Sequence, residues 1–144
     1  MSKSAPWKDF ERKIAKRFNG KRVVRADFSV MDLDVVAEPF GIECKYKKDL
    51  SPDVALEEAE FIIENKEERK HLLPIAVIQR VGTKGKEEAV FRLKLLVQLG
   101  IIDITLPEIA EVIIVVPLGR FLDILNRGSI SYGKQGSVIT SSRK

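Results

Sequence analysis

The segment from Asp34 to Lys45 sets two carboxylates and an ammonium among apolar, mostly β-branched residues. Two short apolar runs flank Glu-Pro-Phe-Gly at 38–41, and Pro with Gly between such runs favours a β-hairpin. If the Pro and Phe are the central turn residues, Asp34 lies opposite Lys45 and Val36 lies opposite Glu43. Strand side chains alternate with period two, so Asp34, Glu43 and Lys45 then share one face. Charges on such a face are costly to bury, which marks a candidate functional site.

Composition limits the class of protein. The 144 residues are 44% hydrophobic and 32% charged, which predicts one soluble globular domain. No apolar run approaches the ~20 residues of a membrane span, and we expect neither a span nor a signal peptide. The single cysteine, Cys44, cannot form an internal disulfide, which favours a reducing, cytoplasmic location. With only one histidine, His71, a zinc site of the finger type is excluded.

The net charge of +4 is unevenly distributed along the chain. Residues 1–25 hold nine Lys or Arg against two acids, and residues 51–70 hold seven acids against three bases. The Gly/Ser-rich tail, residues 129–144, is basic and is expected to be mobile or to contact nucleic acid. This distribution favours one face that binds a polyanion, with an ordinary solvated surface as the alternative.

Apolar periodicity and turn residues predict the order of the elements. We expect helices over 6–19, 51–70 and 117–125, and strands over 21–26, 32–37, 42–47, 74–81 and 112–116. Residues 91–97 alternate and predict another strand, with a helix over 88–99 as the rival, while 100–111 remain unassigned. This order predicts an α/β fold in three layers, with a mixed central β-sheet flanked by helices in a single domain over 1–128.

The first predicted helix carries a carboxylate at the edge of its apolar stripe. Trp7, Phe10, Ile14 and Phe18 recur at helical spacing, and Glu11 falls beside Trp7 and Phe18. Both Trp7 and Phe10 are expected in the core rather than as base-stacking platforms. Glu11 is a candidate functional group, and the alternative is that it points outward or pairs with a neighbouring Arg.

Two strand carboxylates on one face suit a magnesium ion. Mg²⁺ prefers oxygen ligands, here Asp34 and Glu43, and the backbone carbonyl of Cys44 can complete the protein's share. Mn²⁺ is the expected substitute. Such a cation promotes attack of water on a phosphodiester and neutralises developing charge. Lys45 would orient or deprotonate that water. Glu11 could reach the same site through the metal, a water or a basic partner.

A series of short motifs in the first fifty residues carries a resemblance to a known family. In chain order they are Glu11-Arg12, Val23-Val24-Arg25, Ser29, Asp34-Val35-Val36-Ala37 and Ile42-Glu43-Cys44-Lys45. The pattern resembles the PD-(D/E)xK nuclease superfamily, and within it the archaeal-type Holliday junction resolvases. The match covers residues 6–48, is loose over 51–81 and offers little past residue 82.

The resemblance implies a restriction-endonuclease-like fold and a metal-dependent endonuclease that cuts two strands of a four-way DNA junction as a homodimer. It implies an active-site set of Glu11, Asp34, Glu43 and Lys45, with Glu11 as a further metal ligand. It also implies a helper role for Ser29 and DNA contacts for Arg12 and Arg25, and Lys47 and Lys48 extend the same basic surface.

Several alternatives stay open. Asp32 lies two residues before Asp34 and has the same strand parity, but Val-Val-Ala follows Asp34 as in the family pattern. The charged set could be a structural ion cluster. The chain could also be another nuclease of the superfamily, of restriction, repair or flap type, or a non-catalytic nucleic-acid-binding module. The long segment 82–128 leaves the position of the dimer interface unassigned.

Overall fold

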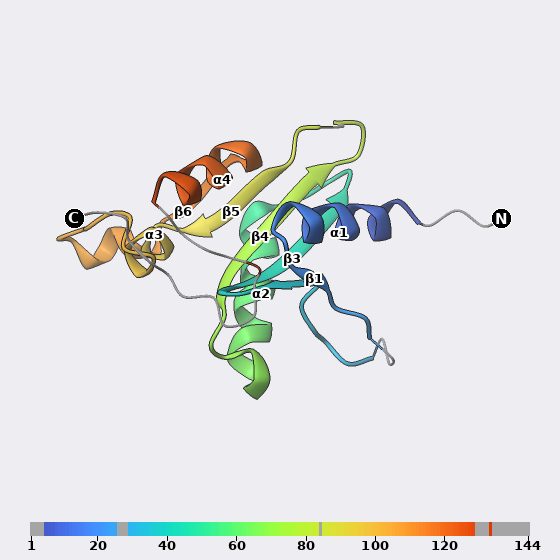
Figure 1. The fold of residues 1–144 in the computed structure, drawn as a ribbon, viewed down its shortest axis with the longest axis horizontal. Helices are drawn as coiled ribbons and strands as arrows, with labels where there is room; N and C mark the ends of the chain where they lie inside the picture. Colours follow the sequence, from blue (N-terminus) through green and yellow to red (C-terminus); the bar gives the residue numbers. More distant parts are fainter. Residues whose placement is uncertain (1–4, 26–28, 84, 129–132, 134–144) are drawn as a thin grey trace.

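The computed structural model describes residues 5–25, 29–83, 85–128 and 133, and its centre is one six-stranded sheet (Figure 1). The elements are α1 (Pro6–Arg17), β1 (Lys21–Arg22), β2 (Val35–Ala37), β3 (Phe40–Lys47), α2 (Pro52–Asn65), η1 (Glu67–Arg69), β4 (Leu73–Arg80), β5 (Glu88–Arg92), α3 (Lys94–Gln98), η2 (Pro107–Glu111), β6 (Ile113–Pro117) and α4 (Leu118–Arg127). The strands lie side by side in chain order. Strands β3 and β4 pair in parallel, and the other described neighbours pair antiparallel. The expected mixed α/β sheet is therefore confirmed.

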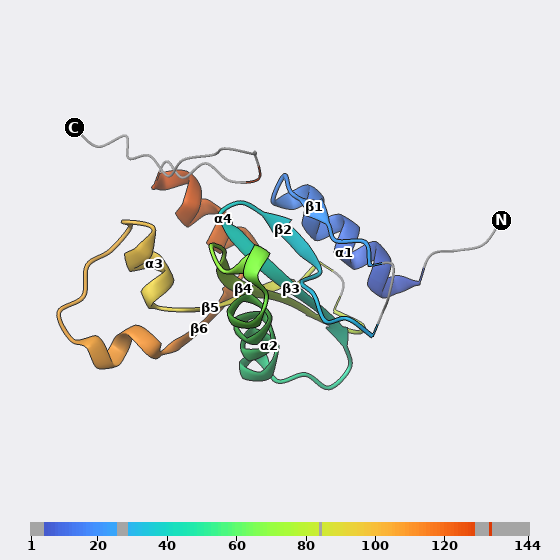
Figure 2. The same cartoon turned by 90° about the horizontal axis from the view of Figure 1, so that it is seen from below.

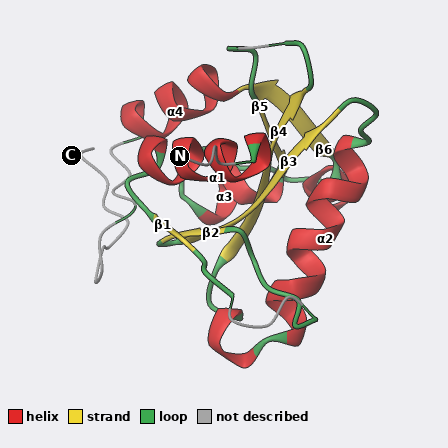
Figure 3. Cartoon of the chain, turned by 90° about the vertical axis from the view of Figure 1, so that its right-hand side faces the viewer, coloured by secondary structure: helices red, strands yellow, loops and turns green. Residues whose placement is uncertain are grey.

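Helices cover both faces of this sheet. Figure 2 shows α1 and α4 on one side and α2 on the other, and Figure 3 shows the same separation from the end. Phe18, Phe40, Phe91 and Phe121 form the centre of the core beneath α1 and α4, and the rings of Phe91 and Phe121 lie 4.9 Å apart. The run 75–78 of β4 is fully buried, as expected for a central strand packed on both faces.

The N-terminal part follows the expected order with shorter elements. Helix α1 has Pro6 in its first turn and ends before Asn19, whose φ of 54° is the expected left-handed stop. Strand β1 ends at Arg22; the N–H of Val23 still donates to the carbonyl of Asp34, and the next residue, Val24, is 80% exposed. Helix α2 stops at Asn65, and a single 3₁₀ turn follows where a continuous helix was expected.

The segment after the β4–β5 turn has neither of the two structures expected from the sequence, a strand over 91–97 or a helix over 88–99. Residues 88–92 instead form β5 and residues 94–98 form α3. Phe91 in β5 and Leu95 in α3 pack into the same core cluster. The change from strand to helix between them allows both side chains to reach it. The unassigned segment contains η2, and the last helix begins at Leu118 as expected after Pro117.

A close approach between α1 and β2 depends on Gly20. A Cβ at this position would lie 2.5 Å from the Cβ of Ala37 and 2.6 Å from the carbonyl oxygen of Val36. The N–H of Gly20 donates to the carbonyl of Ala15, which ties the end of α1 to the start of β1. Glycine therefore allows the helix that carries Glu11 to pack directly against the strand that follows Asp34.

Apart from Gly133, residues 129–144 lie outside the described part of the chain, so the expected basic arm is not described. None of the helices in the described ranges combines the length and the apolar character that crossing a bilayer requires.

Candidate active site

The β2–β3 hairpin has a register two residues away from the expected one. Ala37 pairs with Phe40 and Val36 with Gly41, so the turn is centred on Glu38 and Pro39, and Val36 does not face Glu43. A shift by two residues keeps every side chain on its face, because the strand period is two. The shared face of Asp34, Glu43 and Lys45 therefore survives. Continuing the observed register sets Asp34 beside Glu43 rather than opposite Lys45.

Asp34 is 6% exposed and occupies the last position before β2. Its Oδ2 accepts a hydrogen bond of 2.8 Å from the backbone N–H of Cys44, and its Oδ1 lies 3.2 Å from Nη2 of Arg25. Burial raises the pKa of Asp34 to about 6; the Glu11 carboxylate also raises it, while the Cys44 N–H and the Arg25 charge oppose the shift. This carboxylate is thus fixed at the edge where β2 meets β3.

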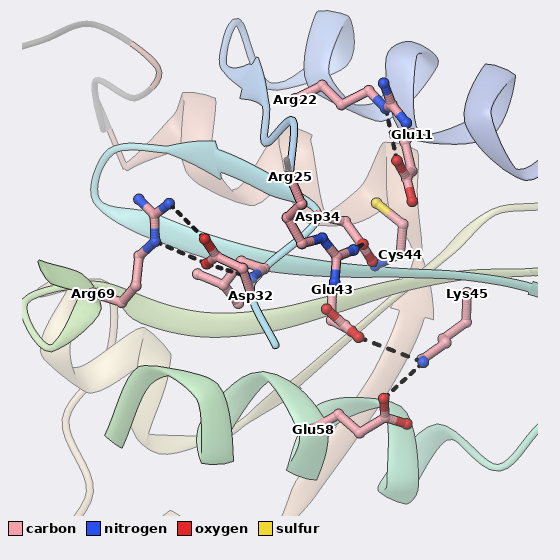
Figure 4. Close-up of polar contacts among 11 residues, drawn as sticks. Glu11, Arg22, Arg25, Asp32, Asp34, Glu43, Cys44, Lys45, Glu58 and Arg69 are labelled. Carbon is pink, nitrogen blue, oxygen red and sulfur yellow. Dashed lines mark hydrogen bonds and ion pairs between the residues drawn. The ribbon is translucent and has the colours of Figure 1, made fainter. Parts of the chain in front are cut away.

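Glu43 and Lys45 point toward α2, where Glu58 meets them (Figure 4). Nζ of Lys45 lies 3.4 Å from Oε2 of Glu43 and 2.7 Å from Oε1 of Glu58. Burial, with the charge of Asp34, raises the pKa of Glu43 to about 8. Among the described residues, Oε1 of Glu43 is buried and finds no hydrogen-bond partner. A buried carboxyl with an unsatisfied oxygen is costly unless a proton or a cation satisfies it.

Glu11 approaches from the other side of the strand, next to the sulfur of Cys44 (Figure 4). It is 6% exposed, and its Oε1 accepts a 2.7 Å hydrogen bond from Nε of Arg22. The expected alternative, pairing with a neighbouring Arg, is therefore confirmed. Glu11 still lines the same cleft as Asp34 and raises the pKa of that carboxyl, so pairing does not remove it from the site.

The structure separates Asp32 from Asp34. Oδ1 and Oδ2 of Asp32 accept hydrogen bonds of 3.0 and 3.1 Å from Arg69 of η1, and Oδ1 also accepts from the N–H of Leu33. Burial alone would raise the pKa of Asp32, but the bonds to Arg69 and Leu33 lower it overall. Both carboxylate oxygens thus have strong donors. Asp32 serves as a structural partner of Arg69, whereas Asp34 lies beside Glu43.

A cleft of about 450 Å³ contains these groups. It is lined by Trp7, Glu11, Arg25, Met31, Asp32, Asp34, Glu43, Cys44, Lys45, Tyr46, Lys47, Glu58 and Ile62. The cleft therefore unites the expected catalytic residues Glu11, Asp34, Glu43 and Lys45 with two of the expected DNA contacts.

Three expected site residues lie elsewhere in the described structure. Arg12 is exposed and forms an ion pair with Asp9, with Nη1 to Oδ1 at 3.0 Å. Lys48 and Ser29 are exposed and are not among the described residues that line the cleft. Trp7, expected in the core, is 42% exposed at the cleft.

The donor set fits a hard cation such as Mg²⁺. Within the described ranges, no three His, Cys, Asp or Glu side chains are close enough to form a ready-made cluster. Mg²⁺ is commonly held by one or two carboxylates together with waters and substrate phosphates, so Asp34 and Glu43 are a sufficient protein share. The N–H and C=O of a strand residue face the same neighbour, so the Cys44 carbonyl faces the side of Asp34. Oε1 of Glu43, which has no hydrogen-bond partner among the described residues, is a carboxylate oxygen that such a cation could use.

Sequence reasoning missed three partners of the site. Glu58, Arg22 and Arg69 each pair with a cleft residue, at 2.7, 2.7 and 3.0 Å respectively. Glu58 had a signal, because it lies three residues after Ala55 and four before Ile62, at the border of the buried face of α2. No sequence pattern indicated Arg69, because its approach to Asp32 depends on the path of the chain between α2 and β4.

Comparison of the chain with protein-family models, with curated proteins and with solved structures gives no match.

Proposed function

We propose that this protein is a metal-dependent DNA endonuclease of the PD-(D/E)xK type, with a restriction-endonuclease-like fold, and that it resolves four-way junctions. The observation that carries the proposal is the pair of buried carboxyls, Asp34 and Glu43, with Lys45 two residues further along the same strand face. Both carboxyls have a raised pKa, which is typical of groups arranged for chemistry rather than for simple ion pairing.

The roles follow from where each side chain lies. Asp34 and Glu43, with the Cys44 carbonyl, would hold Mg²⁺ or Mn²⁺. The bound cation would neutralise charge on the scissile phosphate and make water a better nucleophile. Lys45 donates toward the same space and would hold the attacking water or the phosphate oxygen. Glu58 positions Lys45 through their 2.7 Å contact.

The rival interpretation, a purely structural ion cluster, explains part of this network. Arg22 with Glu11 and Arg69 with Asp32 are complete pairs of that kind. A structural cluster is expected to satisfy each buried oxygen, because an unpaired buried acceptor costs about 1–3 kcal/mol. Oε1 of Glu43 is the exception among the described residues, and this exception favours a ligand.

The choice of DNA is supported by the charges around the cleft. Arg25 and Lys47 line it together with Lys45, and residues 1–25 hold nine Lys or Arg against two acids. Such side chains bind phosphates without reading sequence. Two symmetric cuts in a four-way junction require two active sites, so we propose that the active form is a homodimer.

One cleavage experiment tests the proposal. The full chain is offered a four-way junction, a flap and a linear duplex of matched sequence, each with Mg²⁺ or with EDTA. Paired, symmetric nicks confined to the junction and dependent on Mg²⁺ support the resolvase. Cuts of the duplex at a fixed sequence, or of the flap alone, indicate a different nuclease of the superfamily. Binding of all three with no cut contradicts catalysis and favours a binding module.

A further inference from the structure

The only tryptophan of the chain, Trp7, lies at the candidate active site without serving the core. Its side chain is 42% exposed, whereas Phe10, Ile14 and Phe18 on the same helix are 5%, 0% and 0% exposed. The apolar stripe of α1 is therefore complete without it. A large aromatic ring left open to solvent on a cleft wall is a feature of binding surfaces more than of folding.

Two cations lie close to this ring. Nζ of Lys8 is 5.4 Å and Cζ of Arg22 is 6.0 Å from a ring centroid of Trp7. Arg22 is held in place by its 2.7 Å hydrogen bond to Glu11. An aromatic ring with a cation beside it suits a nucleotide, because the ring stacks on the base while the Lys8 ammonium approaches the phosphate and Arg22 stays bound to Glu11.

The cleft beside the platform has room for a nucleotide. Its volume of about 450 Å³ lies within the range of small-ligand pockets. Met31, which is 51% exposed, adds a second apolar side chain to the lining. The polar floor of Asp34, Glu43 and Lys45 belongs to the same cleft, so a base on Trp7 would bring its own phosphate toward those groups.

We propose that Trp7 stacks on a single unpaired nucleobase next to the phosphate that is cut, and thereby selects DNA in which a nucleotide can leave the helical stack. This inference rests on the proposed nuclease function and names the structural feature of DNA that the site reads. Extruding a base from a continuous duplex costs a few kcal/mol, and the cost is smallest for a base that is already unpaired.

A binding experiment in EDTA tests the stacking without any cleavage. The emission of the single Trp7 is recorded while a short oligothymidine, or a duplex of equal length, is added to the full chain. Quenching by the single strand well beyond that by the duplex is expected. In the matched control, Trp7→Phe combined with Phe61→Trp, the tryptophan is on the exposed side of α2, and its emission should not respond.

Substitution separates stacking from general packing. Trp7→Ala is expected to weaken binding of the oligothymidine about 5- to 100-fold, and Trp7→Phe to restore most of it, because a phenyl ring also stacks. Phe61→Ala should leave binding unchanged. In cleavage with Mg²⁺, Trp7→Ala should reduce the ratio of junction to duplex cutting, chiefly through a higher KM for the junction.

The outcomes distinguish this inference from the function on which it rests. If the junction is cut and Trp7→Ala leaves both the ratio and the oligothymidine affinity unchanged, stacking is wrong and the nuclease stands. If no DNA is cut but Trp7 emission responds and Trp7→Ala weakens binding, stacking stands and the nuclease is wrong. Emission that changes with protein concentration alone and ignores oligothymidine would show that Trp7 belongs to a contact between copies, which overturns the inference.

Discussion

The ammonium of Lys45 lies 2.7 Å from the carboxylate of Glu58, so one ion pair joins strand β3 to helix α2 directly beside Glu43. Burial lowers the pKa of Lys45, but the hydrogen bond to Glu58 and the charges of Glu43 and Asp34 outweigh this effect and raise it overall. Lys45 is thus held as a cation whose position is set from outside the hairpin. A residue on a different element decides where the candidate catalytic ammonium points.

Removing the Glu58 charge should therefore lower the pKa of Lys45. We expect Glu58→Gln to shift the side-chain titration of Lys45, followed by NMR, toward lower pH and to reduce cleavage more than DNA binding. Glu57→Gln is the matched control, because Glu57 is exposed one residue away on the same helix. An unchanged Lys45 titration in Glu58→Gln would contradict the positioning role.

Substitution of the paired carboxyls should abolish cleavage and spare binding. Asp34→Asn and Glu43→Gln each remove a proposed cation ligand and are expected to slow junction cleavage by on the order of 100-fold or more. Junction affinity, measured by gel shift in EDTA, should change little. Asp32→Asn is the control in the same cleft, where the loss of the Arg69 pair should reduce stability rather than chemistry. Cutting at the wild-type rate by Asp34→Asn or Glu43→Gln would show that the site is assigned to the wrong residues.

Stability in EDTA should fall as pH rises from about 4 to about 8. The pKa of Asp34 is raised from 3.8 to about 6 and that of Glu43 from 4.5 to about 8, so the folded state binds more protons than the unfolded chain in this window. The stabilisation that these two carboxyls contribute is complete below about pH 4. It is lost as the pH rises through their pKa values in the folded protein, about 6 for Asp34 and about 8 for Glu43.

Urea denaturation at several pH values measures this dependence. Glu43→Gln removes one of the titrating groups, so its free energy of unfolding should fall less across the window, with a difference from wild type on the order of a few kcal/mol by about pH 8.5. A variant with the same pH slope as wild type would mean that Glu43 does not hold its proton in the folded protein.

Cation binding should release protons. At pH 7 the raised pKa of Glu43 keeps this carboxyl largely protonated, and a bound cation requires the ionised form. Calorimetric titration with Mg²⁺ in buffers of different ionisation enthalpy should show proton release, and affinity should increase between about pH 6 and 8. Asp32→Asn should keep the proton release and Glu43→Gln should lose it. Buffer-independent heats in the wild-type protein would contradict binding at Glu43.

The packing of α1 against β2 should be sensitive to a single methyl group. The Cβ of Gly20→Ala would meet backbone and Cβ atoms of β2 at 2.5–2.6 Å, so the helix must move away. We expect a loss of about 1–3 kcal/mol in the free energy of unfolding, as for other overpacked sites. Gly119→Ala is the control, since nothing lies within 4 Å of its added Cβ. The shift of Glu11 away from Asp34 should also reduce cleavage at temperatures where the variant is fully folded.

The β2–β3 hairpin shows which features of the site the local sequence pattern can predict. Alternation along 34–45 predicted the shared face of Asp34, Glu43 and Lys45, and that prediction holds although the expected register was wrong by two residues. Parity is a local property of a strand and survives an even shift, whereas the register depends on which residues close the turn. The buried run of β4 and the stop at Asn19 were predictable for similarly local reasons.

Residues that depend on packing between elements were harder to predict. The change from β5 to α3 was missed because the apolar positions of that segment satisfy both periods, and only the core beneath α4 decides between them. Trp7 fits the apolar stripe of its helix by spacing, yet it is 42% exposed and lines the cleft.

The sequence by itself determined the order of most elements, the parity that puts two carboxyls and an ammonium on one face, and the motifs that resemble a nuclease family. The tertiary structure decided which charges are paired and which are not. Asp32 is paired with Arg69 and Glu11 with Arg22, while Oε1 of Glu43 has no partner among the described residues. Such pairing depends on distances between chain segments far apart in sequence, and the burial that raises the two pKa values comes only when helices close over both faces of the sheet.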